Sequence, residues 1–464
     1  MKNLLSSQSI REFLDNVQEA TPETLPTAGA LTFENVGQRW AELGLQPGDL
    51  VLFSLPNGRA LLEQFFGALH AGLVPVMLAP NLPSTRIKDL VRVLRARALA
   101  APRLNPAALE ASRSDLLGTL EVCLFRHDQP SLTKPGEVVL LTSGTSGFSS
   151  GCVFNIEQLL LNGQRHADAI GQRSTDTVLV NLPLYYSFAL VAQTLGTFVR
   201  RGRLVIDGPP FQVPRYVRAL AEYQVDVSAL TPILSRALLR TEGAFAETSR
   251  VLSIGGDSLI PEDVAALLQR RPDRELYLTY GLTQAGPRVS TLSAHREPPE
   301  RFSSVGLPLA GTTVSFRPAA GDAHLQELLV TSATVMQRKI GLVEGRSPHS
   351  DAANGTVATG DIFEQDAEGY LFFKGRLSDF IVKNGEKISL AGVRRVATQL
   401  PDVVNAKTKV IVNEAGDQDF ELTLFVSSET HDYEGQLRRQ LRRTELPCKT
   451  HVEHHERTLV RGHK

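Results

Sequence analysis

The sequence has few of the residues that mark specialised classes of protein. Only three of its 464 residues are cysteines, Cys123, Cys152 and Cys448, and they lie far apart. An odd, scattered set of this kind argues against a disulfide framework and against a CxxC metal motif. No charge of one sign dominates, because 49 Lys and Arg stand against 50 Asp and Glu for a net charge of −1. Neither nucleic acid nor an anionic membrane surface is therefore indicated as the main partner.

Long apolar runs are also missing. The longest, residues 71–80, is too short to span a bilayer and contains Pro75. The first residues, MKNLLSSQSIREFLDN, lack the apolar centre of a signal peptide. We therefore expect no membrane span and a cytoplasmic protein. Apolar residues make up 42% of the chain and charged residues 21%, which is typical of a globular protein, and the length indicates two or three domains.

Helix-like and strand-like segments alternate along the first part of the chain. Apolar runs predict strands at 50–53, 74–78, 138–141, 178–180, 203–206 and 251–254. Helical spacing predicts helices at 34–43, 61–71, 89–98 and 214–223. This alternation predicts an α/β fold with doubly wound, mostly parallel sheets that carry helices on both faces.

The pattern changes in the last third of the chain. Residues 305–375 show short strands without a long helix, which predicts a small β subdomain. After Gly375, strand and helix patterns that include an Arg-rich helix at 434–443 predict a small α+β domain. We therefore expect two domains, 1–375 and 376–464.

The strongest chemical signal is a loop rich in glycine and hydroxyl groups. Directly after the strand predicted at 138–141 come Thr142, Ser143, Gly144, Thr145, Ser146 and Gly147. Backbone N–H groups in such a loop can converge on one anion, and the hydroxyls add hydrogen bonds. This pattern favours binding of a phosphate-bearing nucleotide over a plain surface linker. The loop is not a Walker A motif, because no Gly-Lys-Ser/Thr follows.

The loop resembles the phosphate loop of the adenylate-forming superfamily, which includes acyl-CoA synthetases, aryl and fatty acid ligases, nonribosomal adenylation domains and luciferases. Further segments follow in that family's order. Residues 182–190 are similar to the segment that opens the acyl pocket, and 255–259 to the Gly-Gly that contacts adenine. Residues 280–284 resemble a Tyr-Gly-x-Thr-Glu motif, and 359–361 and 375–388 resemble the last motifs around the hinge.

The resemblance implies a role for each matching residue. The loop from Thr142 to Gly147 would hold phosphates, and Thr283 would contact the α-phosphate as a catalytic residue. The base and ribose would be held by Gly256, Asp257, Tyr280, Gly281, Asp361 and Arg376. Within this set, Tyr280 is expected to stack on adenine with its hydroxyl in water, and Asp361 to accept the ribose hydroxyls. The acid pocket would be lined by Tyr186, Phe188 and Ala189.

The resemblance also implies a two-step reaction with ATP and Mg²⁺. A carboxylate attacks the α-phosphorus to give an acyl-adenylate and pyrophosphate. The carboxy-terminal domain then rotates, and a thiol of CoA or of a carrier protein takes the acyl group. Residues 185–190 contain no acid that could pair with a substrate ammonium, and an unpaired buried ammonium is costly. We therefore expect an acid without an α-amine: a fatty, aryl or polyenoic acid.

Four positions depart from the family pattern. Ser150 stands where a lysine usually ends the loop, and Gln284 where a glutamate usually binds Mg²⁺. The hinge position is Ser378, and the candidate catalytic lysine is the last residue, Lys464. Gln284 could offer Mg²⁺ only a neutral amide oxygen. Two hypotheses stay open: an acid–thiol ligase, which we favour, and a degenerate homologue that binds nucleotide or acyl-adenylate as a scaffold or regulator.

Overall fold

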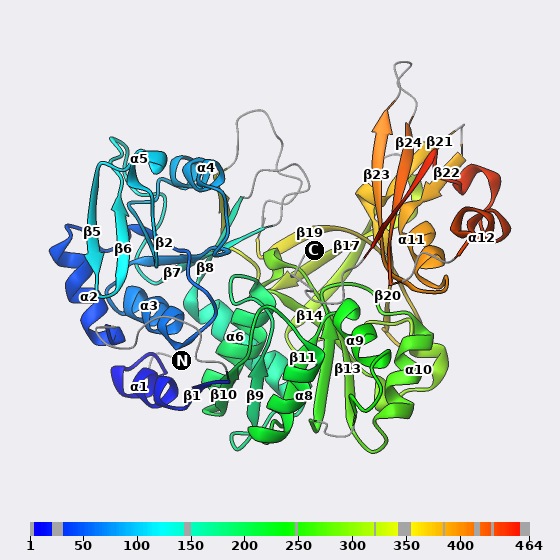
Figure 1. The fold of residues 1–464 in the computed structure, drawn as a ribbon, viewed down its shortest axis with the longest axis horizontal. Coiled ribbons are helices and arrows are strands. Elements are labelled where there is room, and N and C mark those ends of the chain that lie inside the picture. Colours follow the sequence, from blue (N-terminus) through cyan, green and yellow to red (C-terminus); the bar gives the residue numbers. More distant parts are fainter. Residues whose placement is uncertain are drawn as a thin grey trace.

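The computed structural model describes residues 4–20, 31–142, 150–245, 249–319, 322–341, 354–383, 386–412, 418–427 and 431–454. Its largest sheet has eight strands in the order β1-β10-β9-β11-β12-β13-β14-β15 (Figure 1). The first six of these run parallel, and β14 and β15 are antiparallel to their neighbours. Their bounds are β1 Val17–Glu19, β9 Thr177–Val180, β10 Arg203–Ile206, β11 Val227–Leu230, β12 Val251–Gly255, β13 Glu275–Gly281, β14 Arg288–Ser293 and β15 Leu307–Pro308.

Helices cover this sheet. Every residue of β9, β11 and β12 is buried, as expected for parallel strands with both faces covered. The accompanying helices are α1 Ser7–Asp15, α6 Ile156–Ala169, α7 Gly196–Arg200, α8 Val213–Glu222, α9 Pro232–Leu239 and α10 Pro261–Arg270. The π-helix η1, Phe188–Leu195, leads directly into α7.

A second sheet belongs to the amino-terminal part of the chain. Its order is β3-β2-β4-β6-β5, with β3 Val74–Met77, β2 Leu50–Phe53 and β4 Ala98–Ala101 parallel, and β6 Leu120–Leu124 and β5 Arg113–Leu117 antiparallel. Its helices are α2 Phe33–Glu42, α3 Arg59–His70, α4 Ser84–Leu94 and α5 Pro106–Leu109. Beside it lies the antiparallel sheet β18 Arg338–Ile340, β8 Gly151–Asn155 and β7 Glu137–Leu141.

One predicted helix in this part needs correction. The spacing placed a helix at 89–98, but α4 ends at Leu94 and Ala98 already belongs to β4. Arg95 adopts a left-handed conformation with φ 53°, which ends the helix. The alanine-rich strand that follows carries no β-branched side chain, so its sequence gives no strand signal.

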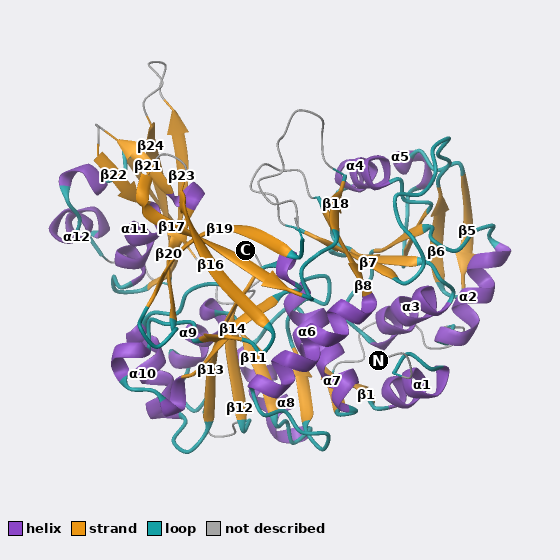
Figure 2. Ribbon diagram, turned by 180° about the vertical axis from the view of Figure 1, so that it is seen from behind, coloured by secondary structure: helices purple, strands orange, loops and turns teal. Residues whose placement is uncertain are grey.

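The last third of the chain is rich in antiparallel strands. One sheet has the order β16 Thr312–Ala319, β17 Asp322–Ser332, β19 Thr356–Gln365 and β20 Leu371–Arg376. Then follow β21 Phe380–Lys383, β22 Glu386–Ser389, α11 Leu390–Thr398, β23 Val403–Val412, β24 Gln418–Val426, α12 Tyr433–Gln440 and β25 Lys449–His454. Figure 2 shows β23 and β24 at the upper left, above β16, β17 and β20.

Three apolar cores hold these elements. The largest spans the amino-terminal and central parts and includes Trp40, Phe66 and Phe154. A smaller one lies under α4, and a third is formed only by residues from Ile381 to Leu441. None of the described helices is long and apolar enough to cross a membrane.

Candidate active site

The candidate site begins where β12 and β13 end. Ligands of open α/β sheets bind outside the carboxyl ends of the parallel strands. Gly255 ends β12 and Gly256 follows with φ 93°, a left-handed conformation that favours glycine. Tyr280 and Gly281 end the neighbouring strand β13. The residues that the sequence assigned to the base therefore share one edge of the large sheet.

Asp361 and Arg376 are brought to Tyr280 by the sheet of β19 and β20. Asp361 lies opposite Arg376 in the register of these strands, and Arg376 Nε is 3.3 Å from Asp361 Oδ1. Tyr280 Oη donates a hydrogen bond of 2.6 Å to Asp361 Oδ2. Three predicted nucleotide residues thus form one cluster. The hydroxyl of Tyr280 is bound to a carboxylate, whereas the sequence interpretation had placed it in water.

The carboxyl group of Asp361 is 4% exposed. Burial raises its pKa, while the charge of Arg376 and the hydrogen bond from Tyr280 act in the opposite direction. Burial and the adjacent Asp361 carboxylate in turn raise the pKa of Tyr280 well above its usual value. At neutral pH Tyr280 is therefore a hydrogen-bond donor.

The backbone around Asp361 is fixed by side chains of its own sheet. Gly360 has φ 72°, and its N–H donates to Glu327 Oε1 at 2.9 Å. Asp361 N–H donates to Thr359 Oγ1 at 3.0 Å, and Thr359 Oγ1 donates to Leu328 O at 2.8 Å. The Thr-Gly-Asp segment is thereby held so that the carboxylate faces Tyr280.

Thr283 lies beside the segment that the sequence assigned to the acid pocket. Its Oγ1 is 3.3 Å from Ser187 Oγ. Asn57 anchors this segment, because its Nδ2 donates to Leu182 O at 2.9 Å and its Oδ1 accepts from Leu184 N at 2.8 Å. The proposed phosphate contact and the proposed pocket are therefore adjacent.

The three predicted pocket residues differ in burial. Tyr186 is half-buried, whereas Phe188 and Ala189 are buried at the start of η1. This π-helix packs closely on α6: a Cβ added to Gly163 would lie 2.9 Å from Val191 O. Single π-helical turns are rare and often mark functional sites, and η1 has eight residues.

The phosphate loop is described only at its two ends. Thr142 N donates to Ser150 O at 3.0 Å, and the Oγ atoms of these two residues are 3.1 Å apart. These contacts close the base of the loop with neutral groups only. Several predicted residues lie outside the described part of the chain, namely Ser143, Gly144, Thr145, Ser146, Gly147 and Lys464. Ser378 lies in a short 3₁₀ helix, Leu377–Asp379, and its side chain is not described.

The proposed metal position offers little to a hard cation. Gln284 lies in the 3₁₀ helix Thr283–Ala285, where its carbonyl oxygen accepts a hydrogen bond of 2.9 Å from Met336 N. Among the described residues, no group of three or more His, Cys, Asp or Glu side chains is placed to hold a metal ion. Asp257, which was assigned to the nucleotide, is exposed and bonds through Oδ1 to the next backbone N–H.

Arg288 is a residue of this site that the sequence interpretation missed. It starts β14, pairs in register with Gly281, and is 3% exposed. Its guanidinium carbon lies 3.6 Å from the centre of the Phe188 ring. The sequence Gly-Pro-Arg is typical of an exposed turn. It gives no sign that β14 begins inside the core, so the burial of Arg288 could not be predicted from it.

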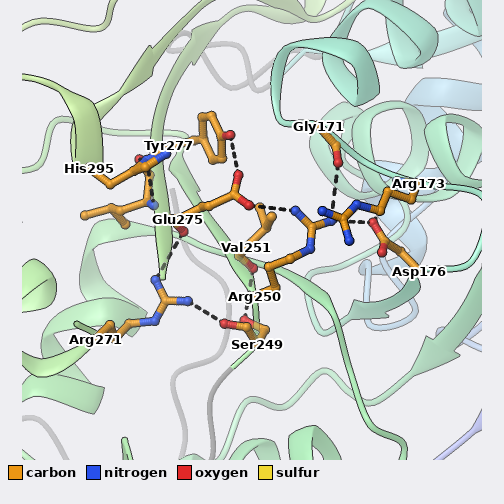
Figure 3. A network of polar contacts seen from close by, with 11 residues as sticks. Gly171, Arg173, Asp176, Ser249, Arg250, Val251, Arg271, Glu275, Tyr277 and His295 are labelled. Atoms are coloured by element: carbon orange, nitrogen blue, oxygen red, sulfur yellow. Dashed lines mark hydrogen bonds and ion pairs between the residues drawn. The ribbon is translucent and has the colours of Figure 1, made fainter. Parts of the chain in front are cut away.

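At the opposite, amino ends of the parallel strands, polar side chains form a network of hydrogen bonds and ion pairs (Figure 3). There Arg250 donates to Asp176 Oδ2 at 2.7 Å and to Glu275 Oε1 at 2.8 Å. Glu275 Oε2 also accepts a hydrogen bond of 2.6 Å from Tyr277 Oη. These contacts join the amino ends of β9, β12 and β13, away from the candidate site.

Comparisons with known proteins place the chain in a family of enzymes. The sequence profile described as "AMP-binding enzyme" matches residues 32–336. The chain is 25% identical over 383 residues to a long-chain-fatty-acid–CoA ligase of Mycobacterium tuberculosis, covering 78% of this chain and 75% of the relative. It is 28% identical over 411 residues to a feruloyl-CoA synthase of an Amycolatopsis species, covering 81% and 79%. Among solved structures, o-succinylbenzoate CoA synthetase of Bacillus subtilis with its acyl-adenylate superposes with a TM-score of 0.76 at 19% identity, covering 97% and 94%.

Proposed function

Since this chain belongs to the AMP-binding enzyme family, we propose that it uses ATP to convert a carboxylic acid into an acyl-adenylate and then transfers the acyl group to a thiol. The observation that carries this proposal is the cluster of Tyr280, Asp361 and Arg376 at the carboxyl edge of the large sheet. Its polar groups suit an adenosine, and the pocket segment lies next to it through Ser187 and Thr283. Nucleotide and acid would therefore meet at Thr283.

Each residue contributes by positioning or by charge. Asp361 accepts the two ribose hydroxyls, and Arg376 adds a planar donor to the ribose or a phosphate. The ring of Tyr280 packs on adenine, and its hydroxyl keeps Asp361 in place. Thr283 donates to the α-phosphate on which charge grows during attack. The loop 142–147 supplies backbone N–H groups to the outer phosphates.

Magnesium enters this reaction with its substrate, as MgATP. Mg²⁺ is usually held by one or two carboxylates together with phosphate oxygens. Gln284 provides an amide in place of a carboxylate, so the nucleotide's own phosphates would supply most of the ligands. Ser150 is likewise neutral, so the metal would have to neutralise more of the negative charge of the phosphates.

The acid lacks an α-amine, because the pocket segment Tyr185 to Leu190 offers no carboxylate to an ammonium group. A fatty or aryl acid agrees with the names of the fatty-acid and feruloyl relatives. Those relatives are CoA ligases by name, which favours CoA over a carrier protein as acceptor. In our proposal, residues 376–464 form a separate domain that turns about Ser378 and brings Lys464 to the adenylate.

The test is release of pyrophosphate by purified protein with MgATP and a panel of fatty, aryl and amino acids. We expect release with one class of acid that lacks an α-amine, and formation of a thioester when CoA is added. Asp361→Ala should raise the KM for ATP about 10-fold or more, since two hydrogen bonds to an ionised acceptor are lost. ATP binding by calorimetry without pyrophosphate release from any acid would favour the degenerate, regulatory homologue.

A further inference from the structure

Arg288 is a buried cation that pairs with no carboxylate in the described part of the chain. Burial lowers the pKa of its guanidinium to about 9, and no other group contributes to that shift. Its Nη1 donates to Thr279 Oγ1 at 2.7 Å, while its Nε, fully buried, has no partner among the described residues. Buried charges are normally paired, because leaving one unpaired costs several kcal/mol.

Two other arginines near the large sheet, the partly buried Arg250 and the buried Arg271, are held by oxygen atoms on more than one side. Arg250 is bound by two carboxylates, and Arg271 by the carbonyl oxygens of Ser249 and Glu275 (Figure 3). Both lie at the amino edge of the sheet. Arg288 lies at the carboxyl edge, beside the candidate site, and has one hydroxyl and an aromatic ring in place of carboxylate or carbonyl oxygens.

Neighbouring residues fix the position of Arg288. Asn162 of α6 holds its backbone from both sides, accepting from Arg288 N and donating to Arg288 O at 2.9 Å each. A Cβ at Gly255 would lie 2.9 Å from Arg288 Nη1, so glycine leaves room for the guanidinium. Nearby His166 is buried, and burial with the charge of Arg288 lowers its pKa to about 3. It is neutral and supplies no counter-charge.

The guanidinium faces the acid side of the site. Successive side chains of a strand point to opposite faces, so Thr279, which binds Arg288, faces away from Tyr280 and Asp361. The ring of Phe188, from the pocket segment, covers one face of the guanidinium. A ring on the face leaves the in-plane N–H groups for a planar anion. Thr283 and Ser187 are half-buried, whereas Arg288 and Phe188 are buried, so the cation lies deeper than the proposed reacting position.

We propose that the acid activated by this enzyme carries a second carboxylate, and that Arg288 binds this distal group beside Phe188. The inference rests on the proposed function and narrows its substrate class from fatty or aryl monoacids to diacids. One carboxylate reacts at Thr283, and the other neutralises the guanidinium. Arg288 is in this proposal a specificity-determining residue that takes no part in the bond-forming step.

The experiment compares matched acids on the wild-type protein. Pyrophosphate release is measured with hexanoate against adipate, with benzoate against terephthalate, and with 3-phenylpropionate against 3-(4-carboxyphenyl)propionate. We expect at least one diacid to exceed its monoacid by about 100-fold in kcat/KM, because a monoacid leaves the buried cation unpaired. Arg288→Met should reverse that ratio, and Arg288→Lys, which keeps charge but loses the planar fork, should give an intermediate ratio. Arg271→Met is the matched control, a buried arginine at the far edge, and should leave the ratio unchanged.

The outcomes separate this inference from the proposed function. If monoacids are used as well as their diacids, or if Arg288→Met lowers both by the same factor, Arg288 is a structural residue and the inference is wrong while the proposed function stands. If no acid of any class releases pyrophosphate, both are wrong. Should Arg288→Met fail to fold, the wild-type ratios and Arg288→Lys still decide the question.

Discussion

Replacing Tyr280 by Phe removes one hydroxyl from the candidate site and leaves the ring. The lost hydrogen bond is 2.6 Å long, and its acceptor, Asp361, is 4% exposed. Hydrogen bonds to ionised groups contribute about 1.5–3 kcal/mol. With an unfolding entropy of about 2.1 cal/mol/K per residue, this corresponds to a drop in the melting midpoint of about 2–3 °C for a chain of 464 residues.

The same change should alter the pH dependence of nucleotide binding. The hydrogen bond from Tyr280 lowers the pKa of Asp361, so its loss raises that pKa further. Asp361 must be ionised to accept two ribose hydroxyls, and in Tyr280→Phe it becomes protonated at a higher pH. Calorimetric titration with ATP should therefore show a larger loss of affinity at pH 6 than at pH 8.

The chain offers a matched control on the same strand. Tyr277 also donates a 2.6 Å hydrogen bond to a carboxylate, Glu275, but at the opposite edge of the sheet. Tyr277→Phe should lower the midpoint by a similar amount and leave ATP binding unchanged at both pH values. The reasoning is refuted if Tyr280→Phe changes neither midpoint nor affinity, or if Tyr277→Phe weakens ATP binding equally.

Three further results are expected. Because burial raises the pKa of Asp361 in the folded state, its charged form opposes folding, and this cost grows as the pH rises through that pKa. The midpoint of Asp361→Asn relative to wild type should therefore be higher at pH 8 than at pH 5; an equal difference at both would contradict this. Arg250→Met leaves two carboxylates unpaired and should cost about 3–5 kcal/mol in urea unfolding without changing ATP affinity. Of the three cysteines, only Cys448 is exposed, and burial raises the pKa of Cys152 to about 12, so native protein should react with one equivalent of a thiol reagent rapidly and with three only when unfolded.

The sequence reveals the parallel strands well, for a physical reason. Strands such as Leu50–Phe53 and Val251–Gly255 are buried on both faces, so they read as uninterrupted apolar runs. Strand Ala98–Ala101 is equally buried but is built from alanine and leucine; it was not predicted, and its first residue was placed at the end of the helix predicted at 89–98. The strand Lys449–His454 joins its sheet parallel to β24 and is polar and partly exposed. Its sequence therefore lacks the alternation of apolar and polar residues that would predict a strand.

The candidate site was predictable where short motifs fix it. Tyr280, Asp361 and Arg376 come from three strands, and their motifs indicated a shared nucleotide site before any contact was known. The motifs do not specify which side chains contact one another. The hydrogen bond from Tyr280 to Asp361 depends on how two sheets pack, and the burial of Arg288 depends on the helices around it. An arginine in a sequence gives no sign of whether its charge will be compensated.

The π-helix η1 lies in the segment that the sequence assigned to the acid pocket, and it is a place where the chain can change its length. A π-helical turn holds about one residue more than an α-helical turn. Deleting one residue between Phe188 and Leu195 would let the segment rewind as an α-helix, and the residues on either side would keep their directions because the number of turns stays about the same. The side chains inside the segment would change direction, while α6 and β10 kept their places. A change in the length of this segment, and not substitution alone, would therefore alter which of its side chains face the inside of the molecule.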